Sequence, residues 1–149
     1  MTLISTSAFR PLRPIDVKYA TVPVQQGFNW GECLADFESG VWHLVVFRSV
    51  RSETAEDSVL AEFDERAYQE ARGSSGFRFY FRGEVDEERR CLSLCVWDTP
   101  EQAREELHQP DHRDAVAHTR EWYEEFSLER YRLSLAPDRR ITIEPLLQV

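Results

Sequence analysis

The segment that most constrains the fold is the β-forming stretch 42–50, with the sequence WHLVVFRSV. Its centre, residues 44–47, is apolar without interruption. A strand with one face in solvent alternates between apolar and polar residues, whereas a strand covered on both faces is continuously apolar. Segment 42–50 is therefore predicted to be a central strand with a layer packed on each face.

A helix and two strands are predicted next. Between residues 54 and 72 the apolar side chains recur at steps of three and four, which is typical of an amphipathic helix: Val59, Leu60, Phe63, Ala67 and Ala71. The turn 73–76 (GSSG) ends that helix. Segments 77–83 and 90–97 are predicted to be strands, joined by the charged connection 86–89.

A strong helix-start signal follows the third strand. Thr99 is a suitable N-cap, Pro100 occupies the first helical position, and Gln102 completes a capping box. These three residues predict a short helix that runs to about His108.

The rest of the chain is predicted to contain one long helix and two strands. Segment 110–126 begins with a proline and carries one broad stripe: Ala115, Val116, Thr119, Trp122, Tyr123 and Phe126. Segment 128–135 is predicted to be the fourth strand. Segment 140–146 is predicted to be an edge strand or a tail that reaches a neighbouring molecule.

The predicted order is strand, helix, strand, strand, helix, strand, which is the βαββαβ order of a ferredoxin-like sandwich. The expected fold class is α+β, with an antiparallel sheet and helices on one face only. Because residues 45–47 and 94–96 are apolar on both sides of their strands, the face without helices needs a cover. A second subunit's sheet is the simplest cover, so we expect a homodimer of the dimeric α/β-barrel type.

Residues 1–41 differ from the rest in being rich in proline, glycine and aromatic residues. They suggest an extended arm with a short helix at 30–37, which Asn29 would cap. Five aromatic side chains favour packing over disorder: Phe9, Tyr19, Phe28, Trp30 and Phe37. We therefore divide the chain into an aromatic-rich arm, 1–41, and a ferredoxin-like domain, 42–149.

The composition narrows the classes of partner and the compartment. A net charge of −9 disfavours nonspecific nucleic-acid binding and docking on anionic membranes, since both need a basic surface. No apolar run approaches the ~20 residues of a membrane span, and the start lacks the pattern of a secretory signal. The three cysteines show no C-x-x-C spacing, so free thiols in the cytoplasm are expected.

Three passages carry a resemblance to a known family. Residues 94–103 (LCVWDTPEQA) and 109–115 (QPDHRDA) look like a strand ending in Trp, an acidic turn, a Glu-x-Ala helix and a Pro-x-His helix start. Residues 129–131 (ERY) lie where the last strand would begin. This pattern resembles the antibiotic-biosynthesis monooxygenase-like family of the dimeric α/β-barrel superfamily. It covers roughly residues 42–135 and does not include the arm.

The resemblance places His112 at the mouth of a pocket between helices and sheet. A neutral imidazole there can accept or donate a proton near pH 7, so His112 is the candidate catalytic residue. The alternative is a histidine that caps a loop or holds the short helix.

The candidate substrate-binding residues are spread over several elements. Trp97 would line a flat pocket for an aromatic ligand, or else serve as a core plug. Tyr80, flanked by Arg78 and Arg82, would give a polar-edged face on which an arginine holds a phenolate or a carboxylate. The alternative for these arginines is an inter-subunit ion pair. The remaining candidates for substrate binding are three: Tyr123, Trp122 and Arg48.

No cofactor or metal is expected. In heme-degrading relatives a histidine of this helix ligates iron, together with an asparagine on the first strand and a tryptophan in the preceding helix. The chain has His118 in the helix, but His43 and Arg48 on the first strand and EEL at 105–107. Heme binding at His118 is therefore the weakest alternative. A metal site at His108 and His112 is disfavoured because a proline interrupts the helix between them.

The resemblance implies a small-molecule enzyme of secondary metabolism, similar to cofactor-independent monooxygenases. Its substrate would be an apolar or aromatic molecule of the polyketide-like kind, bound between helices and sheet. The alternative from another class is a noncatalytic binding or assembly module, whose aromatic arm fills the pocket or clasps a partner subunit. Fold by itself does not decide between them.

Overall fold

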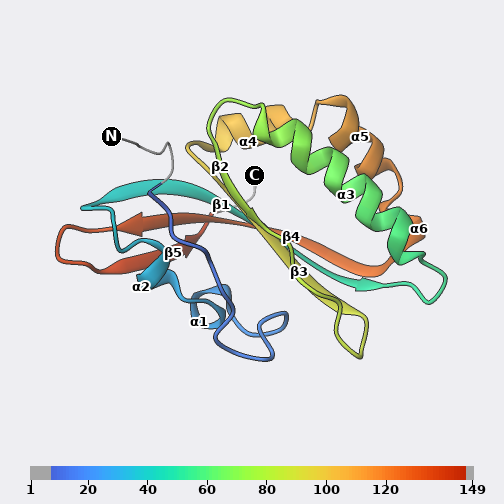
Figure 1. Ribbon diagram of the computed structural model, residues 1–149, viewed down its shortest axis with the longest axis horizontal. Coiled ribbons are helices and arrows are strands. Elements are labelled where there is room, and N and C mark those ends of the chain that lie inside the picture. Colours follow the sequence, from blue (N-terminus) through green and yellow to red (C-terminus); the bar gives the residue numbers. More distant parts are fainter. Residues whose placement is uncertain (1–7, 147–149) are drawn as a thin grey trace.

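The computed structural model describes residues 8–146, so the first seven residues of the predicted arm and the last three of the chain lie outside the described part. One antiparallel sheet with the order β2-β3-β1-β4-β5 forms its centre (Figure 1). The strands are β1 (Gly40–Arg51), β2 (Phe77–Phe81), β3 (Arg90–Trp97), β4 (Tyr123–Leu135) and β5 (Ile141–Pro145). The predicted α+β, ferredoxin-like order of elements is confirmed, with β5 as the added edge strand.

The longer helices lie together on one face of the sheet (Figure 1). They are α3 (Asp57–Arg72), α4 (Pro100–Glu106), α5 (Pro110–Ala117) and the short α6 (Thr119–Trp122). The predicted cap of α4 is confirmed, because the Thr99 hydroxyl accepts a hydrogen bond from the Gln102 amide at 3.2 Å. None of the helices in residues 8–146 has the length and apolar character needed to cross a membrane.

The central strand β1 is covered on both faces, as its apolar centre predicts. Leu44 and Val46 are fully buried in the main hydrophobic core on one face. Val45 packs on the other face against Ala71 and Trp97. The continuous apolar run of β1 is therefore explained by a layer on each side of the sheet.

The second layer is the arm of the same chain, not the sheet of another subunit. Residues 8–39, with the short helices α1 (Val24–Gly27) and α2 (Trp30–Cys33), lie across the face opposite the long helices (Figure 1). The side chains of the arm that are buried against the sheet are Leu12, Val24, Phe28, Trp30, Cys33 and Leu34. The open face from which we expected a partner sheet is thus already occupied, and the homodimer stays a prediction without that support.

Polar contacts hold the arm at both edges of the sheet. The Gln25 side chain donates to the Ile143 carbonyl on β5 at 3.0 Å. The Tyr19 hydroxyl accepts from the Glu84 amide, just beyond β2, at 3.1 Å. The arm therefore spans the sheet from one edge strand to the other, and it does not fill a pocket under the helices.

Two local predictions were wrong. The helix predicted for 110–126 ends at Trp122, and Tyr123 and Phe126 belong to β4, where they pair with Arg51 and Ser49 of β1. The aromatic stripe fits either period, and backbone pairing with the central strand decides in favour of the strand. Asn29 does not cap a helix at 30–37: its side-chain oxygen accepts from the Arg13 amide, and α2 ends at Cys33.

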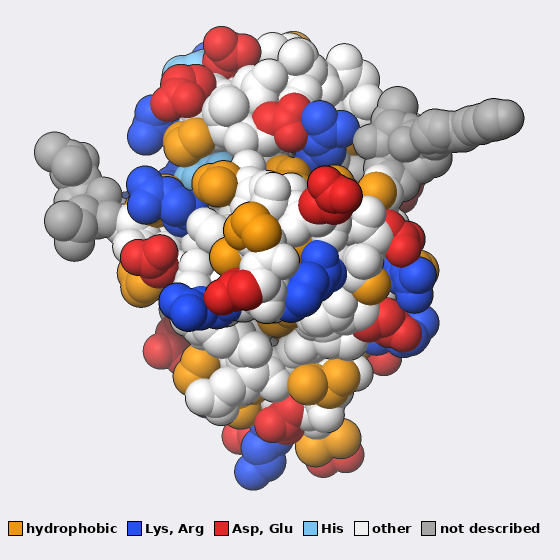
Figure 2. Space-filling model, turned by 90° about the vertical axis from the view of Figure 1, so that its left-hand side faces the viewer, with side chains coloured by type: hydrophobic (Ala, Val, Ile, Leu, Met, Phe, Trp, Pro, Cys, Tyr) orange, Lys and Arg blue, Asp and Glu red, His pale blue; other side chains and the backbone are white. Residues whose placement is uncertain are grey.

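On the side of the molecule drawn in Figure 2, acidic and basic side chains are interspersed, without a continuous basic patch (Figure 2).

Candidate functional site

The buried polar side chains of the described residues lie on the helix side of the sheet. Among the described residues, the buried polar or charged ones are His43, Ser49 and Glu106. His43 and Ser49 alternate with the core residues of β1 that face the arm, and Glu106 belongs to α4. Because burying a polar group costs free energy unless it is paired, these residues need a structural or functional reason. The arm side, by contrast, is a core of apolar side chains.

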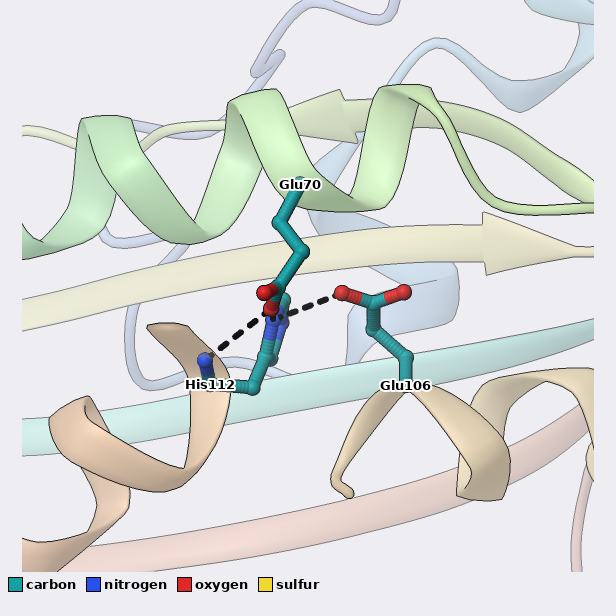
Figure 3. A group of neighbouring side chains, drawn as sticks. All are labelled: Glu70, Glu106 and His112. Atoms are coloured by element: carbon teal, nitrogen blue, oxygen red, sulfur yellow. Dashed lines mark hydrogen bonds and ion pairs between the residues drawn. The ribbon is translucent and has the colours of Figure 1, made fainter. Parts of the chain in front are cut away.

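Glu70 of α3, Glu106 of α4 and His112 of α5 converge in the space between their three helices (Figure 3). The His112 Nδ1 atom lies 3.2 Å from Glu70 Oε1 and 2.9 Å from Glu106 Oε2. The exposed fraction of the side chain is 15% for Glu70, 2% for Glu106 and 26% for His112. The three side chains form a compact acid–histidine cluster, called here the Glu–His cluster.

The start of α5 explains why His112 lies beside Glu70. The first amides of a helix have no partner within the helix, and they attract negative charge. Glu70 of α3 supplies it: its carboxylate accepts from the Asp111 amide at 3.0 Å and from the His112 amide at 3.1 Å. Pro110 removes one more free amide at this end. Glu70 thus caps a neighbouring helix and fixes the position of His112.

The two carboxyl groups have opposite pKa shifts. Burial by itself raises the pKa of Glu70, but hydrogen bonds from the Asp111 amide and from His112 outweigh it, so that pKa lies below its usual range. Burial raises the pKa of Glu106, which is only partly offset by the hydrogen bond from the Ser74 hydroxyl and by the charge of His112. The folded structure therefore favours the ionised form of Glu70 and disfavours the ionised form of Glu106.

The cluster fixes the tautomer of His112. A carboxylate can only accept, and Glu70 Oε1 lies within hydrogen-bond distance of Nδ1, so the proton of a neutral imidazole lies on Nδ1 and the lone pair on Nε2. No residue in the described part of the chain forms a hydrogen bond with Nε2. His112 is thereby set up as a proton acceptor at Nε2, oriented through Nδ1 in the manner of a carboxylate–histidine pair.

A polar pocket of about 330 Å³ lies against this cluster. Its lining comprises Glu70, Gly73, Ser74, Ser75, Gln102, Glu105, Glu106 and Gln109. Two members of the Glu–His cluster thus border space that a small molecule or water can enter.

Tyr80, Arg78 and Arg82 do not form a free anion site. The Tyr80 hydroxyl donates to Asp64 at 2.7 Å, and Arg82 pairs with Asp64 and Glu65. Arg78 pairs with Asp98 at 2.6 Å. The arginines expected to hold a substrate anion are therefore engaged by acids of the same chain.

Trp97 and Arg48 also lie outside an open pocket. Trp97 is 2% exposed, packs on Phe77, and donates from Nε1 to the Cys95 sulfur at 3.1 Å. Of its two predicted roles, this geometry matches the core plug. Arg48 lies on the arm side, where it pairs with Glu129 at 2.9 Å and donates to the Ala20 carbonyl. The sheet therefore separates Arg48 from His112.

Trp122, Tyr123 and His118 form an aromatic group at the far end of α5. His118 stacks on Trp122 with ring centroids 5.2 Å apart, and Tyr123 packs edge-on against Phe47. The His118 Nδ1 atom faces Glu121 at 3.0 Å. The three residues therefore lie next to one another at this end of the helix layer and do not contact the Glu–His cluster.

Sequence reasoning missed Glu70 and Glu106. Glu70 precedes the small residue Ala71 in a charged helix, and Glu106 stands in the acidic stretch 105–106, so both look like solvated helix residues. Only the packing of α3, α4 and α5 shows that they point inward. A single sequence carries no signal for this.

Replacing each glutamate by glutamine is expected to change stability with opposite pH dependence. Because the pKa of Glu70 lies below its ordinary value of 4.5, the ionised carboxylate stabilises the folded state above pH 4.5, and this stabilisation is lost as the pH falls. Glu70→Gln therefore lowers the free energy of unfolding more near pH 7 than near pH 4. The raised pKa of Glu106 penalises the folded state as the pH rises, so the stability of Glu106→Gln relative to wild type improves from pH 4 to pH 7. Urea unfolding at about pH 4 and about pH 7 measures both slopes. Slopes of the same sign for the two variants would contradict this assignment.

Comparison with known proteins identifies the family. The profile of the family described as PB2B2.08-like matches residues 2–145. The chain belongs to the PB2B2.08-like family. A member of known sequence, the UPF0643 protein PB2B2.08 of Schizosaccharomyces pombe, is 30% identical over 136 residues. That match covers 80% of this chain but 62% of the relative, so the chain spans less than two thirds of the relative's length.

Solved structures place this PB2B2.08-like chain in the expected fold. Protein SO0527 of Shewanella oneidensis superposes with a TM-score of 0.56 at 16% identity, covering 66% of this chain and 99% of that one. A candidate antibiotic biosynthesis monooxygenase of Nitrosomonas europaea gives 0.53 at 13% identity, covering 64% and 91%. A dimeric ferredoxin-like protein of Thermobifida fusca gives 0.51 at 12%, covering 61% and 90%. The resemblance seen in the sequence is thereby confirmed as a likeness of fold.

Proposed function

We propose that the protein is a small-molecule enzyme that removes a proton from an apolar or aromatic substrate bound between the helices and the sheet. The observation that carries this proposal is the His112 imidazole, held through Nδ1 by Glu70 and Glu106 with Nε2 unpaired in the described part of the chain. An oriented imidazole can act as a general base on a substrate within its hydrogen-bond reach. The polar pocket bordered by Glu70 and Glu106, the two partners of His112, supplies space next to the cluster.

Oxygenation without an organic cofactor is the reaction that we propose for this base. His112 Nε2 takes a proton from an activated carbon of a phenolic substrate, and the resulting anion transfers electrons to O₂. With a methylene carbon, one oxygen atom becomes the carbonyl of the product and the other leaves in water, so that two hydrogens and one O₂ are consumed per turnover. The fold similarity to a candidate monooxygenase supports this choice as an analogy.

Oxygen uptake with 1,8-dihydroxyanthrone tests the proposal. We expect the protein to accelerate O₂ consumption above the spontaneous rate and to yield the corresponding anthraquinone, identified by mass spectrometry. Heat-denatured protein is the control for autoxidation. Rates equal to this control across a panel of anthrones and naphthols would argue for the noncatalytic alternative.

A metal-dependent reaction at the same cluster is a second candidate, favoured by one observation. Glu106 Oε2 is buried and has no hydrogen-bond partner of normal geometry among the described residues, although it approaches His112 Nδ1 closely. Ligand atoms of Glu70, Glu106 and His112 all lie within 4.8 Å of one another. Carboxylate and imidazole together suit Mn²⁺, Fe²⁺ or Zn²⁺.

Metal titration separates the two candidates. If the cluster is a metal centre, calorimetry with Mn²⁺ and Zn²⁺ detects one site per chain, which Glu106→Gln weakens by about tenfold or more. The exposed pair Arg104–Glu101 offers the control Glu101→Gln. If neither metal binds to the wild-type protein, the metal-dependent reaction is excluded and proton transfer by His112 is the remaining candidate.

A further inference from the structure

Arg130 lies on the helix side of β4. Its guanidinium is half-buried, and no carboxylate in residues 8–146 pairs with it. Within the same residues, the guanidinium has one hydrogen-bond contact, with a histidine: Arg130 Nη1 lies 3.4 Å from His43 Nε2. Because a half-buried cation without a counter-ion is costly, this position is suited to an anion that the protein chain does not supply.

His43 orients Arg130. A guanidinium can only donate, so His43 Nε2 accepts from Arg130 and the ring proton lies on Nδ1. The residue is 2% exposed, and Nδ1, which points away from this contact, has no hydrogen-bond partner in the described part of the chain. Burial, the charge of Arg130 and that of Arg104 lower the pKa of His43 to about 4, so the ring is neutral at pH 7. The Arg130 guanidinium is thus held by a neutral ring and not by an acid of residues 8–146.

The position relates this pair to the Glu–His cluster. Val45 of β1 pairs with Arg130 on β4 and with Cys95 on β3, and these three positions lie in one row on the helix side. Burial is the main cause that raises the pKa of the Cys95 thiol to about 11, and the charges of both Arg130 and Glu106 act on it. Cys95 therefore lies within electrostatic reach of both groups, and its thiol stays protonated.

We propose that Arg130, oriented by His43, is the anion-recognition half of the site and holds the carboxylate of an aromatic acid substrate. The inference rests on the proposed function in one respect, namely that the same helix–sheet space receives the substrate. Arg130 takes the role that the sequence suggested for Arg78 and Arg82, which are paired with acids. The planar guanidinium matches a carboxylate, and the half-buried Val45 and Phe47 give the aromatic ring an apolar surface.

Calorimetric binding of 2-naphthoate and of its neutral counterpart 2-naphthamide tests this proposal at pH 7. We expect the wild-type protein to bind naphthoate about tenfold or more tightly than the amide, the discrimination typical of a charge-assisted hydrogen bond. Arg130→Met should remove this difference by weakening naphthoate alone, and Arg130→Lys should retain part of it. Arg132→Met, which removes an exposed arginine two residues along β4, is the matched control and should change both affinities by about twofold or less.

Three results would overturn the anion site. They are equal affinity of wild-type protein for the two probes, unchanged naphthoate binding by Arg130→Met, and equal losses in Arg130→Met and Arg132→Met. Should Arg130→Met fail to fold, NMR of the wild type still decides, because naphthoate but not naphthamide must shift the ring signals of His43, which contacts the Arg130 guanidinium. His112→Ala separates the two proposals. If this variant binds naphthoate like the wild type but has lost turnover, the result tests the proposed base alone. Loss of the discrimination between the two probes in Arg130→Met tests the anion site alone.

Discussion

Replacing Trp30 by alanine is expected to lower the free energy of unfolding by about 3–5 kcal/mol, the cost of deleting a buried aromatic side chain. Trp30 belongs to the arm, yet it is 4% exposed and its indole donates to the Val24 carbonyl at 2.9 Å. Its loss leaves a cavity in the main hydrophobic core, which arm and sheet share. Urea unfolding measures the change, with the slope of the transition expected to stay constant.

Val17→Ala is the control for this substitution. Val17 lies in the same arm but is 96% exposed, so its truncation should change stability by about 0.5 kcal/mol or less. A Trp30→Ala protein as stable as wild type would mean that the arm is dispensable, and the uncovered sheet would again require a partner. A large decrease in the free energy of unfolding would show that the arm covers and stabilises the sheet face that a second subunit's sheet covers in a two-chain barrel.

His112→Ala is expected to lower the rate of anthrone oxidation by about 10²–10⁴-fold, the usual contribution of a positioned general base. His108→Ala is the control, since His108 is exposed and lies outside the Glu–His cluster. Oxygen uptake at saturating substrate gives kcat for each variant. Equal rates for the His112 variant and the wild type would remove the base from the mechanism, whatever the protein binds.

Intermediate variants would show how the base is held. Glu70→Gln keeps a side chain that can still accept from the α5 amides but removes its charge, so we expect a smaller loss of rate than for His112→Ala. The effect would act through the orientation of His112, which makes Glu70 a positioning residue. The pH dependence of stability of the same variant provides an independent reading of its charge.

Much of the fold follows from local patterns. The continuous apolar centre of β1 predicted a strand covered on both faces, because no exposed strand tolerates such a run. Thr99 and Gln102 predicted the start of α4, because a cap acts through its immediate neighbours in sequence. The alternation of these elements led to the ferredoxin-like order and, through residues 94–103, to the fold relationship that the solved structures confirm.

Tertiary structure decided what depends on contacts between distant segments. The aromatic side chains of the arm predicted that it packs against a protein surface. Because the hydrophobic effect is non-directional, the sequence does not specify which surface that is. The folded structure shows that it is the sheet of the same chain. Likewise the sequence singled out His112, while Glu70 and Glu106, from 42 and 6 residues earlier in the chain, were brought to its ring by helix packing. Whether an arginine pairs with an acid also depends on the folded structure: Arg78 and Arg82 pair with acids, and no acid among residues 8–146 pairs with Arg130.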